Sequence, residues 1–290
     1  MKKVFLYLIF TFFFLFIFLL ATLSTIGIET NKFNKLISEK VLEGKNVDLE
    51  LLTVKFKLDP KELSLFLETR DPKINYQDLY IPVQNIKVYL DFLSLLKSDL
   101  IIKKININLK ELDITQLNKL SKIIKPSTFK SFLNNKILEG KLISEIEIFF
   151  NKEGLLKEFI AKGYVKNLKA KITKDLNLTK TNFSFFADKD DILIKNIFGE
   201  IENIKISDGD IKINLEKEIK INSSFNSKIF FNKRTIDKFS KYFDKNNLLI
   251  KINNLEADLN NNFSVIFDKT YKVKDYSFDN SGILLSLIHI

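Results

Sequence analysis

Two short acidic runs have the spacing that most suggests chemistry, because clustered carboxylates can bind calcium. The first run holds Asp188, Asp190 and Asp191, and the second holds Asp208 and Asp210. A calcium loop also needs oxygen ligands at fixed offsets ending in a bidentate glutamate, and neither run has that layout. We therefore expect these acids to flank tight turns, and we expect no metal and no cofactor.

Glu145 and Glu147 form a carboxylate pair of the kind that serves as acid and base. They alternate with Ile146 and Ile148, so we expect them on the solvated side of a strand. There is no cysteine, and the one histidine, His289, lies at the extreme C-terminus, where it is badly placed for proton transfer. The eight glycines are dispersed and form no phosphate loop. We predict that the protein is not an enzyme.

The net charge of +10 has two interpretations. It could attract anionic lipid head groups or nucleic acid, or it could reflect the lysine-rich and asparagine-rich composition of an AT-rich genome. Lysines alternate with apolar residues, as along 103–107, which is typical of a solvated sheet face. No basic cluster is interleaved with aromatic residues, so we predict no nucleic-acid partner.

An apolar run from Val4 to Ile28 follows Lys2 and Lys3 and contains no charge. About 20 apolar residues span a bilayer. A cleaved signal peptide has a shorter apolar region and a small-residue cleavage site, which residues 20–24 match poorly. The run therefore predicts an uncleaved transmembrane anchor. The basic leader places the N-terminus in the cytoplasm and the rest of the chain outside it.

Beyond the anchor, short runs of alternating apolar and polar residues predict antiparallel strands. Turn residues separate them, notably 151–154, 188–191 and Ser207-Asp208-Gly209-Asp210. Helical spacing predicts helices over about residues 31–43, 113–124, 127–134 and 235–245, with a compact turn or helical segment at 92–97. The predicted fold is mainly β, with a transmembrane helix (1–30), a curved, groove-like antiparallel sheet (31–280) and a tail (281–290).

The order of these elements carries a family resemblance. A short helix ending at Gly44 precedes the strand Val47–Leu51, the stretch Pro82–Lys97 and the strand Ile101–Leu109. Ala161–Leu168 then follows as a later strand. This order resembles the N-terminal region of the AsmA-like family of bacterial envelope proteins, which includes the TamB-like and YhdP-like groups, over roughly residues 1–220.

The resemblance implies a single-pass anchor in the bacterial inner membrane and a periplasmic body. Its members are thought to guide phospholipid toward the outer membrane, so membrane phospholipid is the expected partner. The alternative is a scaffolding module for outer-membrane protein assembly, which would bind an envelope protein through its sheet edges.

The C-terminal residues Leu285–Ile290 do not continue the composition before them. They are similar to translated sequencing-adapter read-through. We therefore expect the chain to be the front part of a longer protein, with residues from about 282 to 290 artefactual.

Apolar residues that alternate along the strands must face something apolar. They could form a closed core against helices or a second sheet. They could instead line a groove open to acyl chains. Each Å² of apolar surface that a chain covers would then contribute a free energy of about 25 cal/mol. The resemblance adds weight to the groove. The groove candidates are Ile105, Ile107, Leu109, Ile146, Ile148, Tyr164, Leu168, Ile172, Phe183, Phe185, Ile192 and Ile194.

Overall fold

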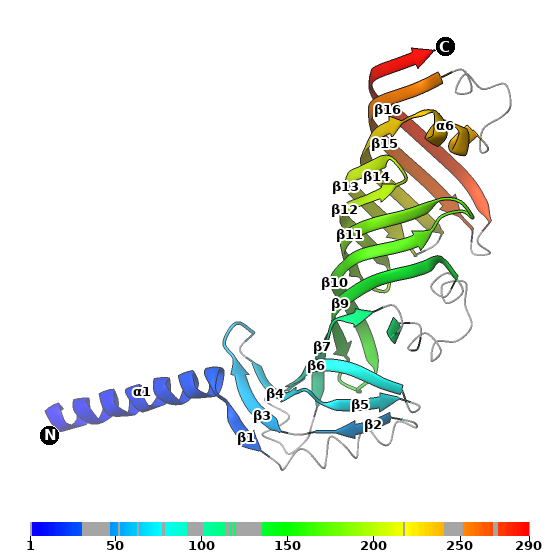
Figure 1. Ribbon diagram of the computed structural model, residues 1–290. Coiled ribbons are helices and arrows are strands. Elements are labelled where there is room, and N and C mark those ends of the chain that lie inside the picture. Colours follow the sequence, from blue (N-terminus) through cyan, green and yellow to red (C-terminus); the bar gives the residue numbers. More distant parts are fainter. Residues whose placement is uncertain are drawn as a thin grey trace. The chain divides into compact units, whose positions relative to one another are not determined.

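The fold is mainly β, as predicted, and a computed structural model defines it (Figure 1). The model describes residues 2–30, 47–51, 53–62, 64–76, 79–91, 101–113, 116–117, 119, 135–216, 218–240, 252–268 and 272–289. These form two compact units, of which the first holds residues 1–110 and 145–159 and the second holds residues 111–144 and 160–290.

Within the described residues the helices are α1 (Lys2–Thr25) and α6 (Lys233–Ser240), besides the helical residues 116, 117, 119, 135 and 136. The earlier strands are β1 (Ile28–Thr30), β2 (Val47–Glu50), β3 (Val54–Asp59), β4 (Ser64–Arg70), β5 (Lys73–Tyr76), β6 (Leu79–Leu90) and β7 (Ile102–Leu109). The later strands are β8 (Leu112–Asp113), β9 (Ile137–Phe150), β10 (Leu156–Lys171), β11 (Asn177–Ala187), β12 (Asp191–Ile201), β13 (Ile204–Asn214), β14 (Ile219–Phe231), β15 (Ile252–Phe267) and β16 (Val273–His289).

The strands form one open antiparallel sheet that does not close into a barrel. Its main path runs β1-β3-β4-β6-β7-β9 and then through β10 to β16 in chain order. Short turns join consecutive strands from β9 to β14, so this part is the predicted meander. Residues 281–289 continue β16 and pair with β15.

Helix α1 joins the sheet through only two residues. Val4–Thr25 is long and apolar enough to cross a bilayer. The hydroxyls of Thr11, Thr22 and Thr25 each donate to the carbonyl four residues earlier, so none needs a water partner. The helix ends where Gly27, at φ 75°, donates its N–H to the Thr22 carbonyl. β1 begins at the next residue.

The first unit has a small closed core. Val54, Leu67 and Leu90 are almost fully buried, and Leu51 and Phe56 pack against them. β6 is long enough to serve two sets of partners, since residues 79–82 pair with β5 while residues 85–90 pair with β4. The closed-core interpretation therefore holds for this part of the first unit.

One predicted turn is wrong. Ser207–Asp210 lies inside the single strand β13, where Asp208 has φ 52° and the pairing with β14 shifts. An Asp-Gly pair favours positive φ, and both a turn and a β-bulge use that conformation. The predicted turns at 151–154 and 188–191 are confirmed.

Of the predicted helices, the last is confirmed in part, as α6. Residues 241–245, to which that prediction extended, lie outside the described residues, as do 31–43, 92–97 and 127–134. The 113–124 prediction falls largely outside them. Its described helical residues are 116, 117 and 119, whereas Asp113 ends β8.

Candidate functional site

The two faces of the sheet in the second unit differ in polarity. Along β14, Ile221, Phe225 and Ile229 are half-buried, while the intervening residues, such as Asn222 and Lys228, are exposed. Successive strand residues point to opposite faces, so all the half-buried residues share one face. We call this the apolar face, and the opposite one the outer face.

The pairing registers carry the apolar face across six strands. One row consists of Ala187, Ile192, Ile213, Ile221, Val265 and Tyr276. The next consists of Phe185, Ile194, Ile211, Ser223, Phe263 and Phe278. A third, near the other strand ends, consists of Leu178, Ile201, Ile204, Ile229, Ala257 and Leu284. The first two rows are neighbours and form one apolar track across the strands. The third row forms a second track.

Between these tracks lies a line of β-bulges. β10 to β13 each hold one non-glycine residue at positive φ where the register shifts. These residues are Asn167 (50°), Lys180 (51°), Asn196 (56°) and Asp208 (52°). Bulges bend a strand and increase its twist. In Figure 1 the strands of this unit accordingly change direction near their middles, with one arm nearer and the other fainter behind it.

The strands bend toward the apolar face. An added Cβ at Gly209 would lie 2.8 Å from the Cβ of Ile197, its cross-strand partner. Facing Cβ atoms are normally about 4.5–5.5 Å apart. Gly199 is similarly close to Thr181, whose Oγ1 would lie 2.5 Å from an added Cβ. Such crowding belongs to the concave side of a bend, and it explains why this face is half-buried.

The bend also carries the polar residues of the apolar face. Ser227 and Asn261 are each only 5% exposed. The Asn261 amide donates to Ser227 Oγ at 3.0 Å and to the Phe225 carbonyl at 3.2 Å, and it accepts from Asn280 at 3.0 Å. These polar groups satisfy one another, so they can stay in an apolar setting at little cost.

Helix α6 packs on one end of the apolar face. Ile236 is 1% exposed, and Phe239 stacks on Phe231 of β14 with ring centroids 4.8 Å apart. Asn232 caps the helix by accepting the Thr235 N–H at 3.0 Å. Within the described part of the second unit, α6 is the helix that contacts this face.

The first unit has apolar rows of its own. One row consists of Ile28, Phe56, Leu67, Val88, Ile105 and Ile148. The neighbouring row consists of Thr30, Val54, Thr69, Ile86, Ile107 and Ile146. The rows are covered at Val54 and Leu67 but half-exposed at Ile105 and Ile148. The first row starts at Ile28, three residues beyond α1.

The structure groups most of the predicted groove residues. Ile105, Ile107, Leu109, Ile146 and Ile148 share one face of the first unit. Leu168, Phe183, Phe185, Ile192 and Ile194 share the apolar face of the second. Apolar residues of β13 to β16 extend that face, and the predicted set omitted them although their alternation was the signal.

Two predicted residues lie elsewhere. Tyr164 pairs with Ser184 and therefore points to the outer face, because the bulge at Asn167 reverses the parity between Tyr164 and Leu168. Ile172 lies beyond the end of β10, where its N–H donates to the Leu176 carbonyl at 2.9 Å. Its side chain is exposed in the turn.

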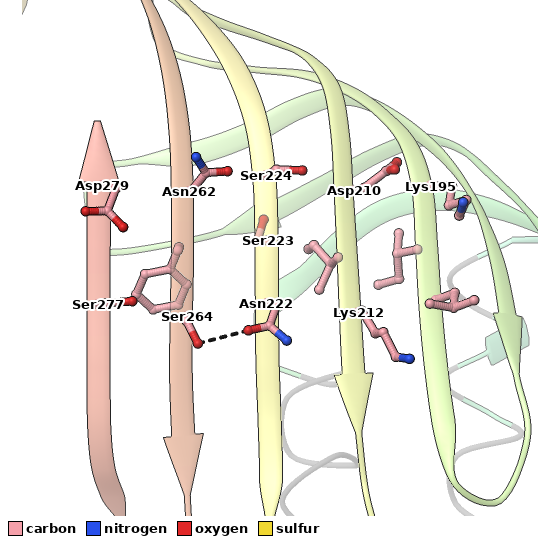
Figure 2. Close-up of a pocket in the computed structure, with 14 residues that line it drawn as sticks. Lys195, Asp210, Lys212, Asn222, Ser223, Ser224, Asn262, Ser264, Ser277 and Asp279 are labelled. Atoms are coloured by element: carbon pink, nitrogen blue, oxygen red, sulfur yellow. Dashed lines mark hydrogen bonds between the residues drawn. The ribbon is translucent and has the colours of Figure 1, made fainter. Parts of the chain in front are cut away.

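The outer face is largely polar and slightly hollow, although Phe186, Phe198 and Phe230 are exposed on it. A depression of about 480 Å³ spans β12 to β16 (Figure 2). Its labelled side chains are Lys195, Asp210, Lys212, Asn222, Ser223, Ser224, Asn262, Ser264, Ser277 and Asp279. Ser264 Oγ donates to Asn222 Oδ1 at 2.9 Å. Apart from Ser223, which the register assigns to the apolar face, these are the residues expected of a solvated face.

The acidic residues have structural partners. Asp188 accepts the N–H groups of Asp190 and Asp191, each at 2.8 Å, and these bonds lower the pKa of its carboxyl. Asp210 accepts the N–H of Asn196 at 3.1 Å, which holds the β12 bulge. Among the described residues, no group of three His, Cys, Asp or Glu side chains could hold a metal ion.

Glu145 and Glu147 are not fully solvated. Both are half-buried on the face opposite Ile146 and Ile148. Glu145 accepts from the Asn106 amide, and Glu147 lies 3.9 Å from the Lys104 ammonium. Lys104 also lies 2.6 Å from Glu62 and 4.3 Å from the ring centroid of Tyr89. These carboxylates therefore belong to a packed polar layer.

In comparisons with known proteins, no family model, no curated protein and no solved structure matches the chain.

Proposed function

We propose that this protein is a membrane-anchored carrier that holds phospholipid acyl chains on its apolar sheet faces. One observation carries the proposal. The first-unit row starts at Ile28, directly after a helix long enough to span a bilayer, and it continues over six strands. An apolar path that begins beside a bilayer suits a ligand that comes from that bilayer.

The apolar face of the second unit supports the same function. Its rows are rich in Ile, Phe and Leu, and they lie on the concave side of the bent strands. Each methylene group that leaves water for such a surface contributes about 0.8 kcal/mol. An acyl chain lying across the strands would keep this contact from one strand to the next, which allows movement without a chemical step.

The location completes the proposal. The basic leader before α1 favours a cytoplasmic N-terminus, with the sheet in the periplasm of a bacterial envelope. The resemblance to the AsmA-like family points the same way and gives a direction, toward the outer membrane. The interpretation of α1 as an uncleaved anchor is part of this proposal.

A photo-crosslinking pair tests it. Ile211 and Lys212 are neighbours on β13 that face opposite sides of the sheet. A photoreactive amino acid at Ile211 should crosslink to phospholipid in cells, and one at Lys212 should not. Mass spectrometry of the natively extracted protein should also find bound phospholipid. Lipid crosslinks at neither position, or equally at both, would sink the proposal.

A scaffold that binds another envelope protein is the second candidate. The observation in its favour is β16, along which Tyr276, Phe278 and Leu284 are more than half exposed. Exposed apolar side chains gathered on one strand are typical of a surface that contacts another protein. One dominant protein crosslinked to Phe278, together with no lipid at Ile211, would favour the scaffold.

A further inference from the structure

Lys205 and Lys228 are direct cross-strand partners on the outer face of β13 and β14. In the described registers of the whole sheet, no other two residues of like charge face each other. Elsewhere opposite charges alternate across strands, as in Glu29, Lys55, Glu68 and Lys87. Like charges directly opposite each other destabilise a strand pair, so this position breaks a rule that the rest of the sheet keeps.

Each lysine also faces a carboxylate on its other side, Lys205 facing Glu200 and Lys228 facing Asp258, but both carboxylates have closer partners than Lys205. Glu200 lies 2.9 Å from the Lys180 ammonium, and Asp258 lies 3.5 Å from that of Lys228. Lys205 has no carboxylate partner within 4 Å among the described residues. Its ammonium lies 6.0 Å from the ring centroid of Phe230, a contact that holds it over the sheet surface.

The two lysines border a depression of about 340 Å³. Lys180, Ser207 and Glu200 also line it, which gives its charged side chains a net charge of +2, from three lysines and one glutamate. Phe198, which is 46% exposed, adds an aromatic surface at the same place. The depression thus combines two facing lysines, a hydroxyl and a ring.

We propose that this depression, defined by Lys205, Lys228, Ser207 and Phe198, binds a phosphate-bearing ligand. A phosphate monoester carries about −1.5 to −2 charges at neutral pH and three acceptor oxygens. It can compensate Lys205, share the Lys228 ammonium with Asp258, and accept from the Ser207 hydroxyl. A carboxylate offers only one charge and two oxygens to the same three groups. Functional sites are expected where a local rule is broken, here the rule that opposite charges face each other across strands. The phosphate would supply the negative charge that the two facing lysines lack.

Binding of inorganic phosphate to the full-length protein in detergent is the first test. Isothermal titration at constant ionic strength should detect binding that falls at least tenfold in Lys205→Gln and in Lys228→Gln. Lys220→Gln is the matched control, because Lys220 is an exposed lysine on the outer face of the same strand but outside the depression. No binding, or equal losses in all three variants, would overturn the proposal.

A second variant separates binding from folding. Lys205→Met removes one of the two facing positive charges without placing a like charge opposite Glu200, so its thermal unfolding midpoint without phosphate should not fall while the upward shift caused by phosphate disappears. A lower midpoint, or a retained shift, would contradict the site.

The source of the phosphate is distinguished by vesicle flotation. Phosphatidic acid and phosphatidylcholine vesicles are compared, using protein in which α1 is held in detergent. Lysine-dependent binding to phosphatidic acid alone identifies a lipid head group. Lysine-dependent binding to inorganic phosphate alone identifies a soluble ester, and binding to neither refutes the site. The apolar faces play no part in this test, so its result is independent of the proposed carrier function.

Discussion

The ammonium of Lys57 lies 2.6 Å from a carboxylate oxygen of Glu68 inside the first unit, where the two side chains are only 11% and 8% exposed. The two residues lie on neighbouring strands, β3 and β4, on the face opposite the Val54 core. A buried ion pair holds its geometry tightly, yet it contributes less to stability than its Coulomb energy suggests because both ions lose hydration.

Lys57→Met should lower the free energy of unfolding by about 3–5 kcal/mol, because it leaves the buried Glu68 charge uncompensated. The double variant Lys57→Met with Glu68→Leu should recover most of that loss. Urea unfolding in detergent measures both. If the double variant were as unstable as the single one, the pair would be contributing far more than this argument allows.

Asp59 gives the first unit an acid-sensitive turn. Burial raises the pKa of its carboxyl, but N–H groups of Glu62 and Lys61 and the Tyr89 hydroxyl outweigh this and lower it below 3.8. The contribution of the Asp59 carboxylate to the free energy of unfolding should therefore be complete well above pH 3.8. It should be lost as pH falls through the lower folded-state pKa. The stability difference between wild type and Asp59→Asn, measured from pH 6 to pH 2.5, should shrink only at the acid end.

Gly209→Ala should destabilise the second unit by about 1–3 kcal/mol, the usual cost of overpacking. The new methyl group would lie 2.8 Å from the Cβ of Ile197, at the bend of the strands. Ser224→Ala is the control, because Ser224 is exposed on the outer face of the neighbouring strand, and it should change stability by less than about 0.5 kcal/mol. Equal effects in urea unfolding would mean that the apolar face is not crowded here.

Lys180→Gly should stabilise the protein by about 0.5–1 kcal/mol. Lys180 has φ 51°, a conformation that costs a non-glycine residue about 1–2 kcal/mol, more than the entropy that glycine loses. Its ion pair with Glu200 is exposed and contributes little. Lys171→Gly, at an ordinary extended position in β10, should instead destabilise. Thermal unfolding measures both variants. Midpoint shifts of opposite sign would confirm the bulge at Lys180, and shifts of the same sign would contradict it.

Alternation was sufficient to predict most of the strands, because in each unit one face of the sheet is mostly apolar. The bulges could not be predicted in this way. Ser207–Asp210 carries the same Asp-Gly signal that a hairpin turn carries, and only pairing with both neighbouring strands shows that β13 continues through it. The position of a bulge depends on how the strand pairs with its two neighbours. A short stretch of sequence does not contain that information.

The same limitation explains the error at Tyr164. Simple parity placed Tyr164 and Leu168 together, but the extra residue at Asn167 reverses every later side chain of β10. Phe183, Phe185, Ile192 and Ile194 do share one face, as their alternation indicated, since neither β11 nor β12 is interrupted between these residues. The facing lysines 205 and 228 were invisible in the sequence, because their partnership depends on a register across two strands.

The short junction after α1 has a mechanical consequence. Any side chain at residue 27 would collide with Lys57 Cγ, at 2.6 Å, and with the Phe56 carbonyl, at 2.9 Å, so helix and strand are wedged together there. A transmembrane helix changes its tilt when the hydrocarbon layer becomes thicker or thinner. Without slack in the junction, β1 and β3 must swing with the helix. The thickness of the surrounding bilayer would then set the angle at which the edge of the sheet meets the lipid surface.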